Sequence, residues 1–163
     1  MATKARPNGH IWMHAEQFHN AAEILWNMGY VDINQIALPL VVNYALSAEL
    51  ALKAAEGITH YGPVIDGIIG AATLESSAHG HDLNRVFAQL RADTQEGIAR
   101  EFQLTSGEPL HPLLAKCADY FVKARYAYES KGGGAYDLTG IRTLAGGLLK
   151  AVMAHGLQRP TGP

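Results

Sequence analysis

The stretch FVKARYAYESKGGG, residues 121–134, contains within a few positions side chains that could bind or cleave a phosphoester. Arg125 is a permanent cation that can hold a phosphate through two donors. Glu129 follows four residues later, so on a helix the two side chains share a face and can form an ion pair. Glu129 could orient Arg125 or act as a weak base. Tyr126 and Lys131 add a hydroxyl donor and a second cation to this candidate catalytic and substrate-binding site.

The apolar stretch PLVVNYALSAELALKAA, residues 39–55, carries Glu49 and Lys53 four positions apart. Burying a carboxylate without a partner is costly, so we expect Glu49 to meet a cation from another helix. Arg125 is the candidate, which would make this arginine a device that ties two helices together. Asn43 is a polar residue of the same helix, and it could join that network or line the substrate site.

His81 and Asp82 stand where a new helix is expected to begin. An acid at that position satisfies free backbone N–H groups, so we assign both residues, with Glu49 and Lys53, to a structural polar network. His79 could join them as a metal ligand, but two histidines beside one acid do not make a full ligand set. The sequence holds no phosphate loop or dinucleotide fingerprint, and we expect neither a metal nor a cofactor.

Composition predicts one globular domain. The chain has 163 residues, of which 48% are hydrophobic and 17% charged, and it has a single cysteine. It shows no signal peptide and no run of eighteen apolar residues, so we expect a cytoplasmic protein with no membrane segment. Residues 1–115 carry six basic and twelve acidic residues, whereas residues 116–163 carry seven and three. The C-terminal third could attract phosphates or form a solvated helix face.

Apolar spacing predicts an all-α fold, an up-and-down bundle of about five helices in residues 10–156 with flexible tails at 1–9 and 157–163. The helices are expected at about 11–28, 36–57, 82–103, 110–131 and 138–155. Residues 57–81 interrupt this pattern with glycines and Pro63, yet contain apolar residues that require burial. This irregular insertion could be a two-stranded excursion or a short helix.

Three segments resemble the HEPN superfamily of helical domains: residues 39–55, GHDLNRVFAQL at 80–90 and FVKARYAYES at 121–130. Together they touch roughly residues 12–150. The resemblance implies a HEPN-like bundle that forms a homodimer. Active members of the superfamily are metal-independent endoribonucleases, commonly toxins or antiviral effectors. They use an arginine followed four to six residues later by a histidine, and two protomers line one cleft.

Here no histidine follows Arg125 in that window, and the next one is His155. A base for the ribose 2′-hydroxyl would have to be Glu129 or a histidine from elsewhere, of which His81 is nearest to a matching segment. We therefore expect an RNA- or nucleotide-associated component of a defence or toxin-antitoxin system, with weak or absent ribonuclease activity. The alternative is a non-catalytic helical interaction module that dimerises or binds a partner protein.

Overall fold

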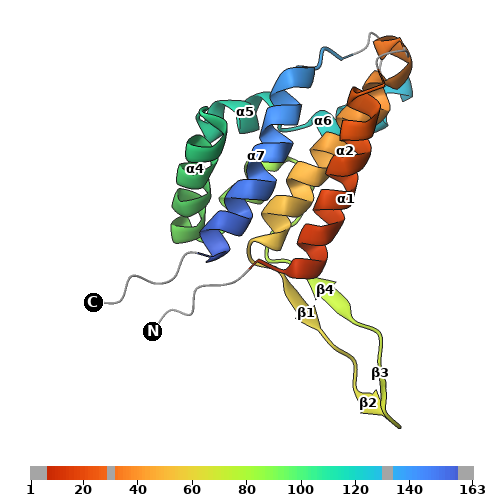
Figure 1. Ribbon diagram of the computed structural model, residues 1–163, viewed down its shortest axis with the longest axis vertical. Coiled ribbons are helices and arrows are strands. Elements are labelled where there is room, and N and C mark those ends of the chain that lie inside the picture. Colours follow the sequence, from red (N-terminus) through yellow and green to blue (C-terminus); the bar gives the residue numbers. More distant parts are fainter. Residues whose placement is uncertain (1–6, 29–31, 130–133, 158–163) are drawn as a thin grey trace.

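The computed structural model describes residues 7–28, 32–129 and 134–157, which form a bundle of α-helices with a thin β-arm at one end (Figure 1). The predicted mostly helical class is confirmed, and short strands are added to it. The long helices are α1 (Gly9–Trp26), α2 (Ile33–Ala54), α4 (Ala92–Ser106) and α7 (Leu138–Leu157). Shorter segments complete the bundle: α3 (Leu83–Ala88), α5 (Leu110–Cys117), α6 (Tyr120–Arg125) and the 3-10 turn η1 (Ala127–Glu129).

Helix α2 is the central helix of the bundle and packs against α1, α6 and α7. Tyr44 and Leu52 on it are fully buried. Among the described helices, α2 has the length and hydropathy to cross a membrane, but half of that window is buried by its neighbours, as in a core helix. Pro39 lies inside α2 and not in its first turn, because the helix begins at Ile33, before the predicted residue 36.

Two predicted helices are broken in the structure. Helix 82–103 divides into α3 and α4, and the Gln95 side chain at the break donates to the carbonyl of Leu90 at 2.6 Å. Helix 110–131 divides into α5 and α6. The carbonyl of Ala118 at that junction accepts a hydrogen bond from the backbone N–H of Leu83 at 2.9 Å. Both breaks are stabilised by partners outside the regular helical ladder, which periodicity does not reveal.

The N-terminal boundary of the fold lies earlier than the predicted residue 10. Asn8 is buried and caps α1, because its side-chain oxygen accepts from the backbone N–H of Ile11 at 3.0 Å. The backbone N–H of Asn8 also donates to the carbonyl of Ala54 at 2.7 Å. Its side-chain nitrogen reaches Thr59, at the base of the arm, at 2.7 Å. Asn8 therefore joins α1, the end of α2 and the arm.

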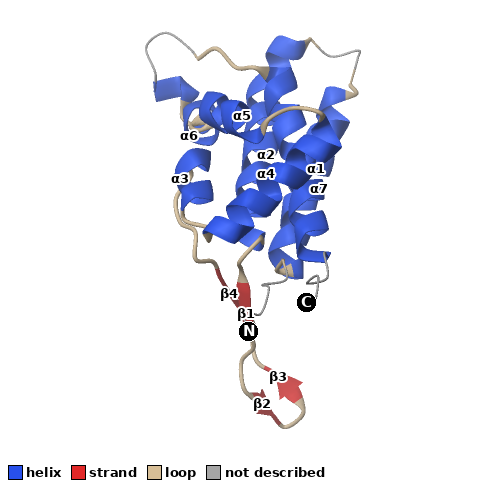
Figure 2. Ribbon diagram, turned by 90° about the vertical axis from the view of Figure 1, so that its left-hand side faces the viewer, coloured by secondary structure: helices blue, strands red, loops and turns tan. Residues whose placement is uncertain are grey.

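Residues 58–75 form the arm, a narrow hairpin that extends away from the helices (Figure 2). Its strands are β1 (Ile58–His60) paired with β4 (Thr73–Glu75), and β2 (Val64–Ile65) paired with β3 (Ile68–Ile69). Asp66 and Gly67 turn the chain with φ of 51° and 78°, the left-handed values of a two-residue hairpin loop. Of the two alternatives for the insertion, the two-stranded excursion is the one that forms.

Candidate functional site

The carboxylate of Glu49 is the buried centre of a polar cluster between α2 and the start of α3. Only 2% of its side chain is exposed. One oxygen accepts a hydrogen bond from Nζ of Lys53 at 2.7 Å, and the other lies 3.0 Å from Nδ1 of His81. The two contacts supply the cationic and donor partners that a buried carboxylate requires. Glu49, Lys53 and His81 thus form a polar network, in which the cation is Lys53 of the same helix and not the expected cation of another helix.

The geometry of this contact orients the imidazole of His81. A carboxylate can only accept, so the proton of a neutral His81 ring lies on Nδ1 and Nε2 is left as the basic nitrogen. The His81 side chain is 52% exposed, so its ring can be reached from solvent. A histidine held by a buried acid on one nitrogen, with the other nitrogen basic, has the arrangement of a general base.

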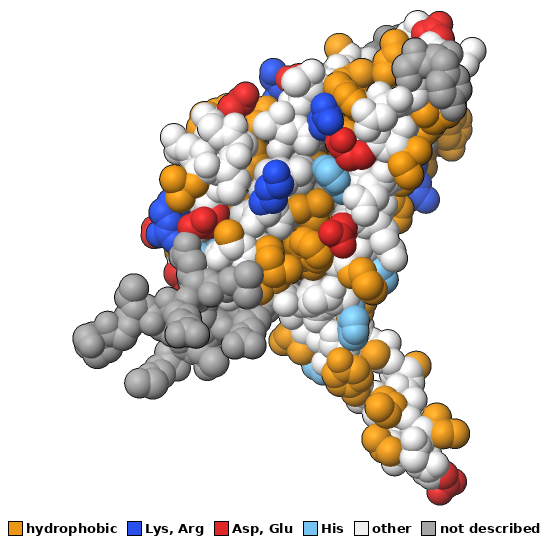
Figure 3. All heavy atoms as spheres, viewed as in Figure 1, with side chains coloured by type: hydrophobic (Ala, Val, Ile, Leu, Met, Phe, Trp, Pro, Cys, Tyr) orange, Lys and Arg blue, Asp and Glu red, His pale blue; other side chains and the backbone are white. Residues whose placement is uncertain are grey.

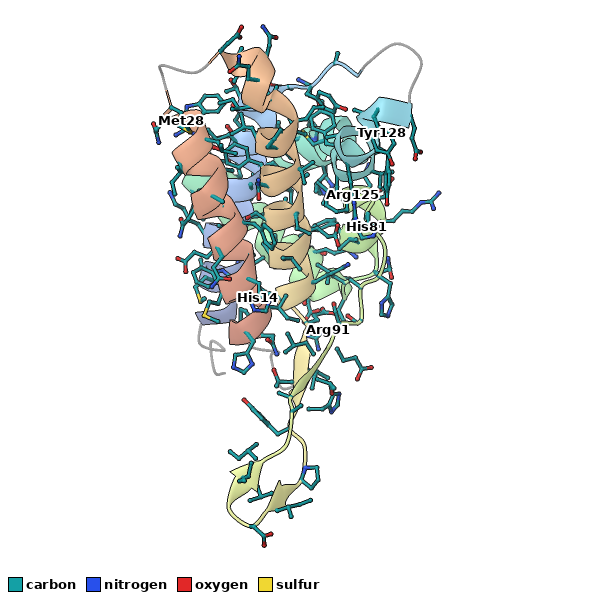
Figure 4. The ribbon with its side chains drawn as sticks, turned by 90° about the vertical axis from the view of Figure 1, so that its right-hand side faces the viewer. His14, Met28, His81, Arg91, Arg125 and Tyr128 are labelled. Atoms are coloured by element: carbon teal, nitrogen blue, oxygen red, sulfur yellow. The ribbon has the colours of Figure 1, made fainter. Side chains whose placement is uncertain are left out.

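Arg125 and His81 both pack on one aromatic ring. The His81 and Phe121 ring centroids are 4.9 Å apart, and the Arg125 guanidinium carbon is 5.8 Å from the Phe121 centroid. The same carbon lies 5.4 Å from the Tyr126 centroid. Figure 4 shows Arg125 and His81 next to each other on the side of α6, with Tyr128 beyond them. An imidazole and a guanidinium, both exposed, therefore lie around one aromatic ring.

The predicted ion pair between Arg125 and Glu49 is wrong. Arg125 is exposed at the end of α6, and both oxygens of Glu49 are already bound by Lys53 and His81. The predicted pair of Arg125 with Glu129 is also absent from the ion pairs of the described residues. The reason is that α6 ends at Arg125 and Glu129 lies in η1, so helical spacing does not hold between them.

The other predicted site residues are placed as follows. Tyr126 is 41% exposed and takes the C-cap position of α6. Asn43 donates to the carbonyl of Pro39 in its own helix at 2.7 Å, so it is apart from the Glu49 network. Asp82 caps α3, as predicted, by accepting from the backbone N–H of Arg85 at 2.9 Å. Lys131 lies outside the described residues.

A second polar cluster, missed from the sequence, lies between α1 and α7. Arg142 donates from Nε to Oε1 of Glu23 and from a terminal nitrogen to Oε2, both at 2.9 Å. The Tyr44 hydroxyl donates to Oε1 of Glu23 at 2.6 Å. Nε2 of His19 lies 3.8 Å from the same oxygen, and Arg142 stacks on Trp26 with 4.6 Å between its guanidinium carbon and the ring centroid. This cluster links α1, α2 and α7.

These contacts change the ionisation of the cluster. The hydrogen bonds from Arg142 are the main cause that lowers the pKa of Glu23 to about 2, so it is an anion at neutral pH. Burial lowers the pKa of His19, which favours its neutral form. Burial and the Glu23 anion raise the pKa of Tyr44, so its hydroxyl keeps its proton. The cluster is a stable ion pair that joins the helices.

A groove of about 970 Å³ adjoins this cluster, with α1 on one side, α7 on the other and the end of α4 at its margin. Apolar side chains from Trp12, Leu149 and Met153 line part of it, and Lys150 is also in its lining. Figure 3 looks onto this face, where apolar side chains gather below a group of basic, acidic and histidine side chains. Its apolar lining and volume are those of a site that can receive another molecule.

The contact between Glu23 and Arg142 carries no signal that sequence reasoning could have used. Glu23 and Arg142 are 119 positions apart, and neither belongs to a recognisable motif. His19 and Glu23 are four apart on α1, as are Glu16 and Asn20, which is a local indication of a polar face there. Among the described residues, no group of three or more His, Cys, Asp or Glu side chains is placed to hold a metal ion.

Comparisons with protein-family models, with curated proteins and with solved structures find no match to this chain. The candidate sites therefore stand on their geometry, which offers one exposed surface with a base and a cation and one amphipathic groove.

Proposed function

We propose that this chain is a HEPN-like, RNA-associated component of a defence or toxin system. Its phosphoester site is the surface formed by His81 and Arg125, with the buried carboxylate of Glu49 holding His81 from below. The observation that carries the proposal is the packing of His81 and Arg125 on the one ring of Phe121. This pairs a base with a phosphate holder, as in the arginine and histidine motif of active HEPN domains. The histidine comes from the start of α3 and not from the helix that carries the arginine.

The chemistry follows from the two side chains. Nε2 of His81 takes the proton of a ribose 2′-hydroxyl, and the 2′ oxygen attacks the adjacent phosphorus. The bond from phosphorus to the 5′ oxygen breaks, and that oxygen takes a proton from solvent or from the imidazolium. Arg125 stabilises the added negative charge of the phosphorane. The products are a 2′,3′-cyclic phosphate and a 5′-hydroxyl end.

We expect this activity to be weak in a single protomer. His81 and Arg125 are exposed, and an open surface neither excludes water nor strengthens electrostatic contacts as a closed site does. Pairing of two protomers with these surfaces facing each other would supply a cleft. Tyr128, which is 80% exposed near this surface, could stack with an unpaired base.

The test is cleavage of single-stranded RNA by the purified protein in the presence of EDTA. We expect slow release of 2′,3′-cyclic phosphate ends, lost in His81→Ala and in Arg125→Ala. His79→Ala is the matched control, because His79 is an exposed histidine two positions from His81. Arg85→Ala is the control for removal of an exposed arginine.

Each outcome has a definite meaning. Cleavage that is equal in the wild type, His81→Ala and Arg125→Ala would indicate a contaminating nuclease and contradict the proposal. RNA binding that depends on Arg125, without cleavage, would retain the RNA association and reject the chemistry. Absence of both binding and cleavage would reject the site.

A second candidate function is supported by a different observation, the apolar surface of the arm. Val64, Ile65, Ile68 and Ile69 are each between 64% and 73% exposed. Burial of one such side chain contributes about 1.5–3 kcal/mol, so the exposed cluster is a strong candidate for a contact surface. We propose on this basis a non-catalytic interaction module that dimerises or binds a partner protein through residues 58–75.

The test of this second function is the association state of an Ile65→Ser, Ile68→Ser double variant. Both residues are exposed, so the unfolding free energy of the bundle should change by less than about 0.5 kcal/mol. Sedimentation should show that association is weakened. Ile24→Ser is the control, because Ile24 is 67% exposed on α1 and lies far from the arm in the chain. Unchanged association in the double variant would reject the arm as a contact surface.

A further inference from the structure

We infer that the arm of one protomer docks in the α1–α7 groove of a second copy of this chain, and that the two copies exchange arms about a twofold axis. This inference names the partner for the second candidate function above and rests on it. Five features of the described residues support it: the two faces of the arm, its length, its rigid base, the lining of the groove, and one charge on each surface.

The arm tip is apolar on both faces. Val64 pairs with Ile69 across the hairpin, and Ile65 pairs with Ile68. Successive residues of a strand point to opposite faces, so one pair lies on each side of the ribbon. A two-stranded ribbon of this size is at best marginally stable alone in water. The tip therefore gains stability from a surface that covers it.

The base of the arm holds the ribbon in a defined direction. Asn8 donates to Thr59 at 2.7 Å, and His60 lies 2.7 Å from Glu75 across β1 and β4. The Ser76 hydroxyl donates to the carbonyl of Lys53 at 3.2 Å. Because its base is attached to α1 and α2, the arm loses less conformational entropy on docking than a free loop would.

The α1–α7 groove offers the surface that the tip lacks. Trp12, Leu149 and Met153 contribute apolar area to a groove of about 970 Å³. This volume accommodates a few aliphatic side chains of the arm tip. The groove and the arm are both solvent-exposed in a single protomer, so each can be covered when two copies meet (Figure 3).

The charges of the two surfaces are complementary. Asp66, at the turn, is the one charged residue of the tip segment 61–72. Lys150 lines the groove and is exposed. No ion pair of the described residues involves either side chain. An acid at the end of an apolar tip matches a lysine beside an apolar groove, and the contact would fix the direction in which the tip enters.

The arm is long enough to make this contact. From Ile58 to Ile65 it spans roughly 23 Å, at about 3.3 Å for each of seven steps. Lys150 lies seven residues before Leu157, the last residue of α7, which is roughly 10 Å at about 1.5 Å per residue. Both the arm and the C-terminal end of α7 lie at the same end of the bundle (Figure 1). If two copies face each other at this end in opposite orientations, the tip of each arm can reach Lys150 of the other.

Such an assembly is isologous, since the same arm and groove meet twice. A substitution in the arm or in the groove therefore changes two contacts of the dimer. A head-to-tail contact, in which one arm enters one groove, would instead leave one arm and one groove unoccupied in each pair. Further copies could then bind there and form an open filament.

The first test is a charge exchange measured by sedimentation equilibrium. Asp66→Lys and Lys150→Glu should each weaken the dimer by about 10-fold or more, because each places like charges together at two contacts. The double variant Asp66→Lys, Lys150→Glu should recover to within about 3-fold of the wild type. Arg85→Glu, on α3, makes the same charge change as Lys150→Glu away from the groove and should have no effect.

The second test is a disulfide between copies. Ile68→Cys together with Met153→Cys should give a covalent dimer on mild oxidation, and neither single variant should. The native Cys117 is buried, and burial raises the pKa of its thiol to about 12, so it does not compete.

The outcomes separate this inference from the function on which it rests. Dissociation by arm substitutions, with no effect of Lys150→Glu and no cross-link to Met153→Cys, would overturn docking in the groove and leave the arm as a contact surface. A monomer at about 100 µM would overturn the inference as well, because a specific interface of this kind should associate at that concentration. Dimerisation that survives the arm substitutions would overturn both.

Discussion

The carboxylate of Glu49 contacts Nδ1 of His81 at 3.0 Å across 32 positions of sequence. This contact attaches the residue that follows the arm to helix α2, which precedes it. The excursion of residues 58–75 leaves the end of α2 and returns beside it, which brings the start of α3 back to Glu49 (Figure 2). The same contact orients the imidazole, so one buried acid serves both the fold and the candidate site.

Removal of the Glu49 carboxylate should be strongly destabilising. Glu49→Ala leaves Lys53, which is 18% exposed, without its partner inside a mostly apolar helix. We expect a loss of about 3 kcal/mol in unfolding free energy, since breaking a buried ion pair leaves an uncompensated charge. Urea denaturation followed by circular dichroism measures it. Glu129→Ala, at an exposed position, should change the value by less than about 0.5 kcal/mol, and an equal loss in both variants would contradict this explanation.

A double-mutant cycle separates the partners of Glu49. The change His81→Ala combined with Glu49→Ala should cost less than the sum of the two single losses, with a coupling of about 0.5–1.5 kcal/mol. Arg125→Ala combined with Glu49→Ala should be additive within about 0.5 kcal/mol, because Arg125 packs on rings and does not reach the carboxylate. Coupling between Arg125 and Glu49 would show that they meet after all.

The long helices could be predicted because each buries an apolar stripe, whose period is visible in the sequence. The breaks at residues 89–91 and 118–119 could not, since they depend on Gln95 and on the hydrogen bond from Leu83 to Ala118. The arm had a local signal. Asp66-Gly67 stands between two pairs of β-branched residues, which is a typical two-residue hairpin sequence.

The candidate site could be predicted only where its contacts are local. Glu49 and Lys53 are one helical turn apart, a spacing that allows the ion pair that forms. His81 reaches Glu49 only through the tertiary fold, and Arg125 was assigned the wrong partner because periodicity does not fix how α6 is rotated against α2. The bidentate contact of Glu23 with Arg142 has no local signal, since the two helices that carry it are the first and the last of the fold.

The Glu23–Arg142 contact predicts a stability that depends on pH. Glu23 has a pKa of about 2 in the folded protein against 4.5 as the ordinary value, so the folded state binds its proton less readily. Its contribution is complete above about pH 4.5 and is lost as the pH falls toward about 2, with a size on the order of 2–3 kcal/mol. Unfolding free energy measured from pH 2 to pH 6 should show this slope.

Two variants, Glu23→Gln and the control Glu129→Gln, test whether Glu23 causes this pH dependence of the unfolding free energy. The first removes the titrating group, so its stability should change less between pH 4.5 and pH 2 than that of the wild type. The second removes an exposed carboxylate and should keep the wild-type slope. A slope that is unchanged in Glu23→Gln would assign the acid sensitivity to other groups.

The packing of α4 on α7 depends on the absence of a side chain at Gly147. A Cβ at this position would overlap the ring of Phe102, which is fully buried. Gly147→Ala should therefore lower the unfolding free energy by about 1–3 kcal/mol, despite the roughly 1 kcal/mol by which alanine favours a helix over glycine. Gly9→Ala is the control, because nothing lies within 4 Å of a Cβ there, and it should be neutral or slightly stabilising.

Phe102→Leu should relieve part of the overlap, so that Gly147→Ala costs less in that background than in the wild type. An equal cost in both backgrounds, measured by urea denaturation, would show that the loss does not arise from contact with Phe102.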